Sequence, residues 1–189
     1  MTTLEALSAR LAVCEDAAKR VRTGNVTLQP ASLAPVVAHC TEAALLGCQL
    51  HQVPSPYYSW ALPRRATELN CTVEQLCKTI VLENVAAPEL SPLTPASLAQ
   101  LPYCRYFAVI VQYCAKCDVH AIERYLRALA ARSGGAVPDV KLRMAAGAAE
   151  LTGFEFNAVT PLGSLTRIPV IVSKAITQLP APASVWIGL

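Results

Sequence analysis

Two short segments of the sequence carry residue types that could bind and polarise a ligand. The first is the apolar run LCKTIVLEN (76–84), with Lys78 and Thr79 close to its start. A lysine ammonium is a compact charge on a flexible apolar stem, so Lys78 could reach a phosphate or a carbonyl oxygen while its stem packs on apolar residues. A surface lysine at the entry to a strand is the ordinary alternative, and this residue alone does not decide between the two.

The second segment is the loop NAVTPLG (157–163), which combines small residues with a proline and a glycine. Pro161 fixes its own backbone φ angle, and Gly163 can adopt conformations closed to other residues. Such a loop can bring backbone N–H groups close to a ligand, where each donor stabilises a developing oxyanion by about 2.7–4 kcal/mol. An ordinary turn would have the same composition.

In combination, the two segments resemble the YbaK and prolyl-tRNA synthetase editing-domain family. The residues that match the family's motifs stand in the family's order: Lys78, Thr79, Thr152, Gly153, Thr160, Pro161 and Gly163. The match runs from about residue 50 to the last residue and includes the apolar run 106–112. The resemblance implies an α/β mixed fold, with a mixed, largely antiparallel and curved β-sheet flanked by helices.

The resemblance also implies an activity, the hydrolysis of the ester that joins a wrong amino acid to a tRNA. The favoured substrate is alanine or cysteine on tRNA-Pro, and the family uses no metal, no other cofactor and no covalent protein nucleophile. By the match, Lys78 would hold the terminal nucleotide, while Asn157 and Ala158 would position the ester carbonyl for attack by water. The implied pocket residues are Thr79, Thr160, Pro161 and Gly163.

An aromatic loop is expected over 54–63. Its Tyr57, Tyr58 and Trp60 could stack on an RNA base or flank the pocket, and we expect Tyr57 and Tyr58 to bind substrate. Covering the hydrophobic core is an equally good explanation of these rings.

Two departures from the family pattern support a second hypothesis. The family has a Gly-Gly pair where this chain has Asn157 and Ala158. Asparagine tolerates a positive φ better than most residues, but an alanine methyl would narrow a pocket or tilt an N–H group. The family also continues beyond the strand matched by VWIGL (185–189). These differences favour a non-catalytic module that binds tRNA or docks in a synthetase complex, as the alternative to a deacylase.

Length and composition predict one well-packed core. The chain has 189 residues, of which 53% are apolar. No apolar run approaches the ~20 residues needed to span a bilayer. The start MTTLEALSAR lacks the pattern of a secretory signal, so we expect a cytoplasmic protein with reduced cysteines and no membrane partner. A net charge of +3 permits a basic patch for an RNA end but does not indicate one.

Other chemistries have weaker support. Cys114, Cys117 and His120 have a spacing that zinc ligands can have, but a second pair at a suitable distance is missing, so we predict no metal site. The same C-x-x-C lacks the sequence context of a thioredoxin-like redox motif. The sequence contains no G-x-S-x-G nucleophile elbow, Walker loop or G-x-G-x-x-G fingerprint.

Hydrophobic periodicity predicts an N-terminal helical extension (1–47) before the editing-like domain (48–189). A helix is expected over 4–23, whose apolar seam could pack on the same chain or bind a partner such as a synthetase. A second helix is expected over 33–46. Further helices are expected at 64–69, 119–132 and 145–151, and strands at 48–53, 79–82, 106–113, 140–144, 154–159, 168–172 and 184–187.

Overall fold

The computed structural model describes residues 30–189 apart from positions 46, 90, 156, 157, 182 and 189. The chain divides into two compact units, Met1–Tyr57 and Tyr58–Leu189. The predicted helix over 4–23, and with it most of the predicted extension, lies outside the described residues.

The described part of the first unit contains one α-helix, α2 (Pro30–Glu42). It begins and ends earlier than predicted. A proline is well suited to a first helical position, and the chain leaves the helix through Ala44, whose φ of 51° is incompatible with a right-handed helix. The strand predicted over 48–53 is wrong, since these residues form neither helix nor strand. An apolar run becomes a strand only when a neighbour pairs with its backbone.

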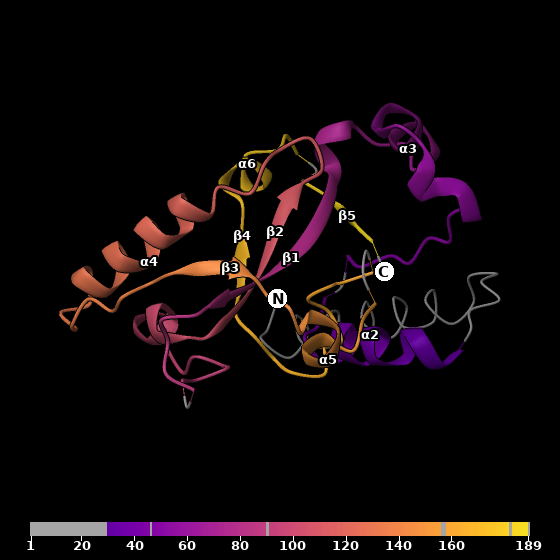
Figure 1. The fold of residues 1–189 in the computed structure, drawn as a ribbon. Coiled ribbons are helices and arrows are strands. Elements are labelled where there is room, and N and C mark those ends of the chain that lie inside the picture. The colour runs from indigo at the N-terminus through magenta and orange to yellow at the C-terminus, as the bar shows by residue number, and fades with distance from the viewer. Residues whose placement is uncertain (1–29, 46, 90, 156–157, 182, 189) are drawn as a thin grey trace, which may run out of the picture. The chain divides into compact units, whose positions relative to one another are not determined.

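The second unit is built around a mixed sheet of five strands (Figure 1). The strands are β1 (Leu76–Asn84), β2 (Tyr106–Gln112), β3 (Leu142–Met144), β4 (Val170–Val172) and β5 (Trp186–Ile187). Their order is β3-β1-β2-β4, with β5 pairing with β1. The β1–β2 and β1–β3 pairs are antiparallel, and the shorter β1–β5 and β2–β4 pairs are parallel. The expected mixed α/β architecture is therefore confirmed.

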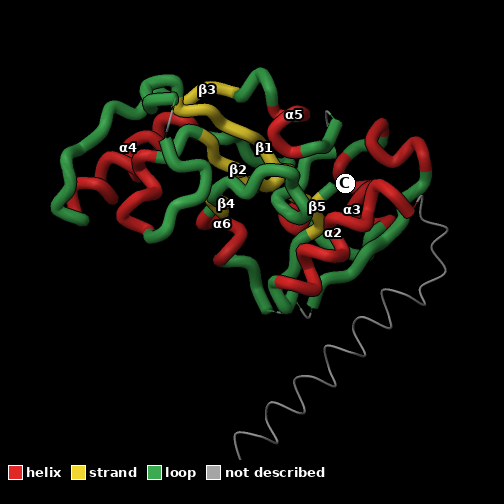
Figure 2. Tube along the Cα trace, turned by 90° about the horizontal axis from the view of Figure 1, so that it is seen from below, coloured by secondary structure: helices red, strands yellow, loops and turns green. Residues whose placement is uncertain are grey.

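Short helices and long loops connect the strands (Figure 2). The helices are α3 (Leu62–Glu68), α4 (Val119–Arg132), α5 (Ala148–Thr152) and α6 (Lys174–Thr177), with 3-10 helices at Ser55–Ser59, Val73–Gln75 and Leu98–Tyr103. The bounds of α4 are those predicted, and Asp118 caps it by accepting the Ala121 N–H at 2.9 Å. The strand predicted over 154–159 is wrong as far as those residues are described. No helix in the described residues is both long and apolar enough to cross a membrane.

The main hydrophobic core joins α4 to one face of the sheet. Successive residues of a strand point to opposite faces, so the β1–β2 register places Leu82 and Phe107 on this face, and both are fully buried. A smaller cluster on the other face joins Cys77 and Ile110 to Ile176 of α6. The buried members of the main core are Leu82, Leu101, Cys104, Phe107, Val109, Val111, Leu126, Val140 and Leu142.

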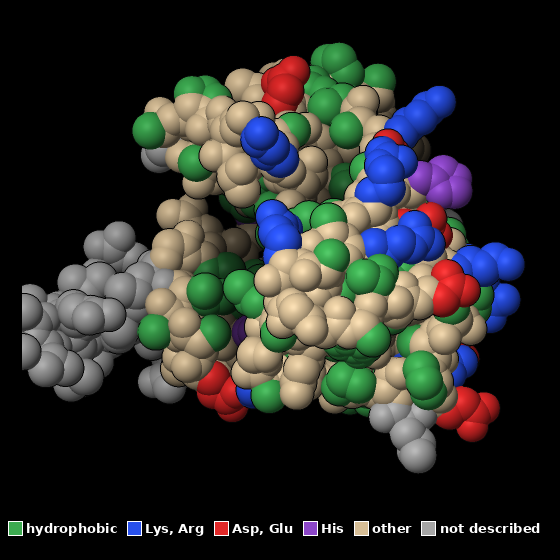
Figure 3. All heavy atoms as spheres, turned by 90° about the vertical axis from the view of Figure 1, so that its left-hand side faces the viewer, with side chains coloured by type: hydrophobic (Ala, Val, Ile, Leu, Met, Phe, Trp, Pro, Cys, Tyr) green, Lys and Arg blue, Asp and Glu red, His purple; other side chains and the backbone are tan. Residues whose placement is uncertain are grey.

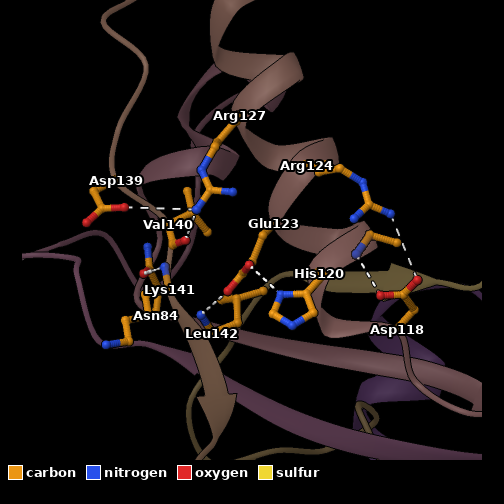
Figure 4. A network of polar contacts seen from close by, with 11 residues as sticks. Asn84, Asp118, His120, Glu123, Arg124, Arg127, Asp139, Val140, Lys141 and Leu142 are labelled. Atoms are coloured by element: carbon orange, nitrogen blue, oxygen red, sulfur yellow. Dashed lines mark hydrogen bonds and ion pairs between the residues drawn. The ribbon is translucent and has the colours of Figure 1, made fainter.

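A buried carboxylate ties α4 to β3 (Figure 4). Glu123 Oε1 accepts the Leu142 N–H at 2.9 Å, and its Oε2 lies 3.1 Å from His120 Nδ1. The hydrogen bond from Leu142 lowers the pKa of Glu123, with help from His120 and against the effect of burial. Nearby, Asn84 Oδ1 accepts the Lys141 N–H at 3.0 Å. These bonds satisfy polar groups at the edge of the core.

A second carboxylate holds three parts of the sheet together. Glu83 on β1 is 6% exposed, and its two oxygens each lie 3.0 Å from an arginine Nη2, that of Arg105 before β2 and that of Arg143 on β3. Both arginines also donate through Nε at 3.2 Å. Burial raises the pKa of Glu83, but the hydrogen bonds from Arg143 and Arg105 outweigh it, so the pKa is lowered overall.

We predict that Glu83→Gln lowers the free energy of unfolding by about 1.5–3 kcal/mol, because it removes charge-assisted hydrogen bonds to a buried group. Urea unfolding at neutral pH would measure the change. Glu68→Gln is the matched control, because Glu68 is exposed on α3 and should tolerate the change.

The stabilities of the wild type and of Glu83→Gln should also differ in their dependence on pH. The pKa of Glu83 is lower in the folded than in the unfolded protein, so its contribution is present above the unfolded pKa, about 4.3 for a glutamate, and is lost as the pH falls through the folded value. The stability gap between the wild type and Glu83→Gln should therefore close in acid. A gap that stays constant throughout acid titration would contradict this role for Glu83.

Candidate functional site

Lys78 is a half-buried cation near the start of β1. The β1–β2 register opposes it to Val111, on the face that α4 covers. Its Nζ lies 5.6 Å from the centre of the Tyr113 ring, and it forms no hydrogen bond or ion pair with the described residues. Burial raises the pKa of the nearby Cys117 thiol, and the Lys78 charge acts against that rise. Lys78 is therefore a cation without a carboxylate partner in the described part of the chain.

Arg65 of α3 lies beside two tyrosines, one of which, Tyr113, also contacts Lys78. Its guanidinium carbon lies 5.4 Å from the Tyr113 ring centre and 5.5 Å from that of Tyr58. Arg65 also donates to the backbone carbonyls of Tyr58 and of Trp60, the latter at 2.9 Å. Burial raises the pKa of both tyrosine hydroxyls. We refer to Lys78, Arg65, Tyr58 and Tyr113 as the Lys78 cluster.

Two neighbours border the Lys78 cluster. Arg64 lies 3.9 Å above the Trp60 ring, beside the carbonyl that Arg65 holds. The C-terminal segment packs against Tyr58, because a Cβ at Gly188 would collide with the tyrosine hydroxyl. Rings and cations arranged in this way form a surface on which a nucleotide base can stack while its phosphate is neutralised.

Basic side chains also gather on the side of the molecule that carries α4 (Figure 3). The side chains of Arg124 on α4 and Arg143 on β3 are 69% and 63% exposed. Acidic residues compensate part of this charge, since Arg124 lies 3.9 Å from Asp118 and Arg143 binds Glu83. This surface could contribute long-range attraction for an anion but forms no site by itself.

Thr79 points to the opposite face of the sheet from Lys78. Its Oγ1 is buried and has no hydrogen-bond partner in the described structure. One edge of β1 pairs with β2. On its other edge, β1 pairs with β5 at Leu76 and Cys77 and with β3 from Leu82 onward. Thr79 lies between these two pairings. A buried hydroxyl without a partner costs about 1–3 kcal/mol, and a ligand or a water commonly satisfies such a group.

The loop after α5 is held by a local hydrogen bond and by a glycine in a left-handed conformation. Thr160 is 1% exposed, and its Oγ1 accepts the Leu162 N–H at 3.3 Å. Pro161 is half-buried. Gly163 has a φ of 73°, a left-handed conformation that glycine adopts without strain. Ser164 Oγ is a second buried hydroxyl without a partner among the described residues.

Ala158 departs from the arrangement that an oxyanion donor needs. Its backbone N–H donates to the Glu155 carbonyl oxygen at 3.0 Å. An N–H that is already bonded can turn to a ligand only if that bond breaks. Asn157 lies outside the described residues, so the catalytic roles predicted for Asn157 and Ala158 remain predictions.

The structure brings together only some of the predicted site residues. Lys78 and Tyr58 share the Lys78 cluster, whereas Lys78 forms no hydrogen bond or ion pair with the described loop residues 158–163. Tyr57 is buried and belongs to the first unit. Arg65 and Tyr113 were not predicted, because no local motif marks them. Arg65 closely follows the aromatic loop over 54–63, which was the one sequence signal near it. Tyr113 had no such signal.

No metal-binding cluster appears in the part of the chain that the structure describes. None of its His, Cys, Asp and Glu side chains gather in a group of three or more that could hold a metal ion.

Comparison with known proteins supports the fold but not a family. No family model matches the sequence, and no curated protein matches it. A crystal structure described as that of "a putative trans-editing enzyme for prolyl tRNA synthetase" has a TM-score of 0.57 and 18% identity, over 82% of this chain and 78% of that one. A structure from a study of epitope backbone grafting by computational design has a TM-score of 0.57 and 16% identity, over 85% of this chain and 81% of that one. At these identities the likeness shows that the chain shares its mixed α/β fold with both proteins.

Proposed function

We propose that this protein is a trans-acting deacylase that hydrolyses the ester of a mischarged aminoacyl-tRNA. The observation that carries the proposal is the Lys78 cluster, a cation without a carboxylate partner in the described residues, placed beside an arginine and two tyrosines. It occurs in a fold shared with a protein described as a putative trans-editing enzyme. Alanine or cysteine on tRNA-Pro is the proposed substrate, by the sequence resemblance.

The Lys78 cluster binds the end of the tRNA in this proposal. Lys78 and Arg65 neutralise phosphate charge at the terminal nucleotide, and the exposed ring of Tyr58 supplies a surface for its base. The Tyr113 ring supports the Lys78 ammonium from one side without neutralising its charge. This leaves the ammonium available to an anion.

The aminoacyl group is held by Thr79 and the loop that contains Thr160, Pro161 and Gly163. Because Thr79 lies on the opposite face of the sheet from Lys78, the substrate must pass the edge of β1 between its pairings with β5 and β3 to reach both residues. Water attacks the ester carbonyl carbon, the bond from that carbon to the ribose oxygen breaks, and the ribose hydroxyl and a free amino acid are released. Positioning and donors to the developing oxyanion are sufficient for an activated ester. The reaction requires no cofactor.

One observation favours the alternative, a non-catalytic module that binds tRNA or docks in a synthetase complex. The Ala158 N–H is bonded to Glu155 and is not directed at a ligand. In this alternative the Lys78 cluster keeps its role in binding, and the protein does not turn over substrate.

Single-turnover kinetics test the proposed enzyme activity directly. In single-turnover assays with tRNA-Pro charged with alanine, cysteine, serine or proline, we expect the wild type to deacylate one mischarged species selectively. Lys78→Ala should slow this reaction by about 10²-fold or more, a loss typical of removing one strong electrostatic contact. Lys174→Ala, an exposed lysine on α6, is the matched control and should react like the wild type.

The possible outcomes separate the two hypotheses. Wild-type rates in Lys78→Ala would contradict the role of the Lys78 cluster. Binding of tRNA without turnover, lost in Lys78→Ala, would favour the binding module. Absence of both binding and turnover in the wild type would exclude the deacylase and a module that itself binds tRNA.

Thr79 can be tested by measuring both stability and deacylation. Because its hydroxyl has no partner in the described residues, Thr79→Val should leave the free energy of unfolding unchanged or raise it by up to about 1–3 kcal/mol, while deacylation falls. Thr160→Val is the matched control. It removes a buried hydroxyl that does accept a hydrogen bond, and it should destabilise the protein by about 0.5–1.5 kcal/mol. A marked loss of stability in Thr79→Val would show that its hydroxyl has a structural role instead.

A further inference from the structure

Two cysteines of the first unit are brought into contact by a reversal of the chain after α2. Cys40 lies in the last turn of this helix, and its Sγ donates to Cys48 Sγ across 3.5 Å. Both are free thiols, and both are partly exposed. A small oxidant could therefore reach a pair of sulfur atoms that are already in contact.

Backbone hydrogen bonds stabilise the turn between Cys40 and Cys48, in addition to the contact between the two sulfur atoms. The Leu45 N–H donates to the Cys40 carbonyl at 2.9 Å, and the Cys48 N–H donates to the Leu45 carbonyl at 3.2 Å. Between them, Ala44 adopts a φ of 51° that turns the chain back. The two thiols are thus positioned before any bond between them forms, which reduces the entropy that ring closure must cost.

We propose that Cys40 and Cys48 are a redox-active pair, which a peroxide converts to an intramolecular disulfide and a small thiol reduces again. This inference concerns the first unit and does not depend on the proposed deacylase activity.

The hydrogen bond indicates the order of the steps. Burial, and then the bond to Cys48, raises the pKa of Cys40 to about 11, so Cys40 remains a protonated donor and Cys48 is the acceptor. Cys48 sulfur attacks one peroxide oxygen, the O–O bond breaks, and a sulfenic acid and water result. Cys40 sulfur then attacks Cys48 sulfur, the S–O bond breaks, and a second water leaves with the Cys40 proton. Hydrogen peroxide is the two-electron oxidant, and the two thiols are oxidised.

No other pair of the described cysteines is in sulfur contact, although Cys114 is near enough to Cys77 to help raise the pKa of its thiol. Cys77 and Cys104 are buried, and burial raises the pKa of each thiol to about 11. Cys114 is exposed, and no sulfur contact joins it to Cys117 in the described structure. We therefore do not expect these residues to form an intramolecular disulfide as readily as Cys40 and Cys48.

Peptide mapping tests the proposal on the reduced full-length protein. After hydrogen peroxide treatment and alkylation with N-ethylmaleimide, trypsin should release Thr23–Arg64, a peptide whose only cysteines are Cys40 and Cys48. We expect this peptide to be two hydrogens lighter than its reduced form and to carry no alkyl group. Cleavage after Glu42 should give two fragments that stay joined until a reductant is added.

Variants make the assignment specific. Cys40→Ser should abolish the lighter peptide, whereas Cys71→Ser, which removes a cysteine of the second unit, should leave it unchanged. The yield should not depend on protein concentration, since the bond is intramolecular. Alkylation of both Cys40 and Cys48 under conditions that oxidise Cys114 would overturn the proposal, as would a wild-type disulfide from either residue to any other cysteine.

Discussion

The antiparallel pairing of β1 with β2 is the interaction on which the rest of the second unit depends. It opposes seven residue pairs, from Cys77 with Gln112 to Glu83 with Tyr106. Leu82 and Phe107 fix the register, because both are fully buried on the α4 face. A slip of one residue would turn every side chain of β1 to the other face. The register therefore also decides that Lys78 lies on the α4 face and that its neighbour Thr79 lies on the other face.

The same register explains why a carboxylate can be buried in the sheet. Glu83 stands opposite Arg143 of β3, and the chain enters β2 just after Arg105. A buried ion pair is weak support for stability in general, because desolvation offsets much of the attraction. Here both oxygens are bonded and the two arginines remain partly in water, so the desolvation cost is limited. A shifted register would separate Glu83 from Arg143, and the ion pairs thus reinforce the alignment that the core requires.

Local patterns predicted the elements whose own sequence determines them. The helix α4 has apolar residues at helical spacing, a capping aspartate at Asp118 and the glycines that follow Ser133, so its bounds could be read directly. The strand predicted over 48–53 had suitable residues but no neighbour to pair with. The Lys78 cluster was only partly predictable, because the tertiary fold brings Tyr113 to Lys78 and Arg65 to Tyr113. Burial of the Thr79 hydroxyl without a partner among the described residues is likewise a property of packing and leaves no mark in the sequence.

In the proposed deacylase, the part that Ala158 can play in catalysis depends on the free energy of one backbone hydrogen bond. The bond from the Ala158 N–H to the Glu155 carbonyl is of a neutral kind that contributes about 0.5–1.5 kcal/mol. An N–H directed at an oxyanion contributes about 2.7–4 kcal/mol to the transition state. If Ala158 exchanges one bond for the other, a net gain of roughly 1–3 kcal/mol remains. The exchange is favourable only once negative charge has developed on the ester oxygen. A paired N–H in the free protein is therefore compatible with catalysis, and its contribution would appear in the rate of the chemical step and not in the affinity for tRNA.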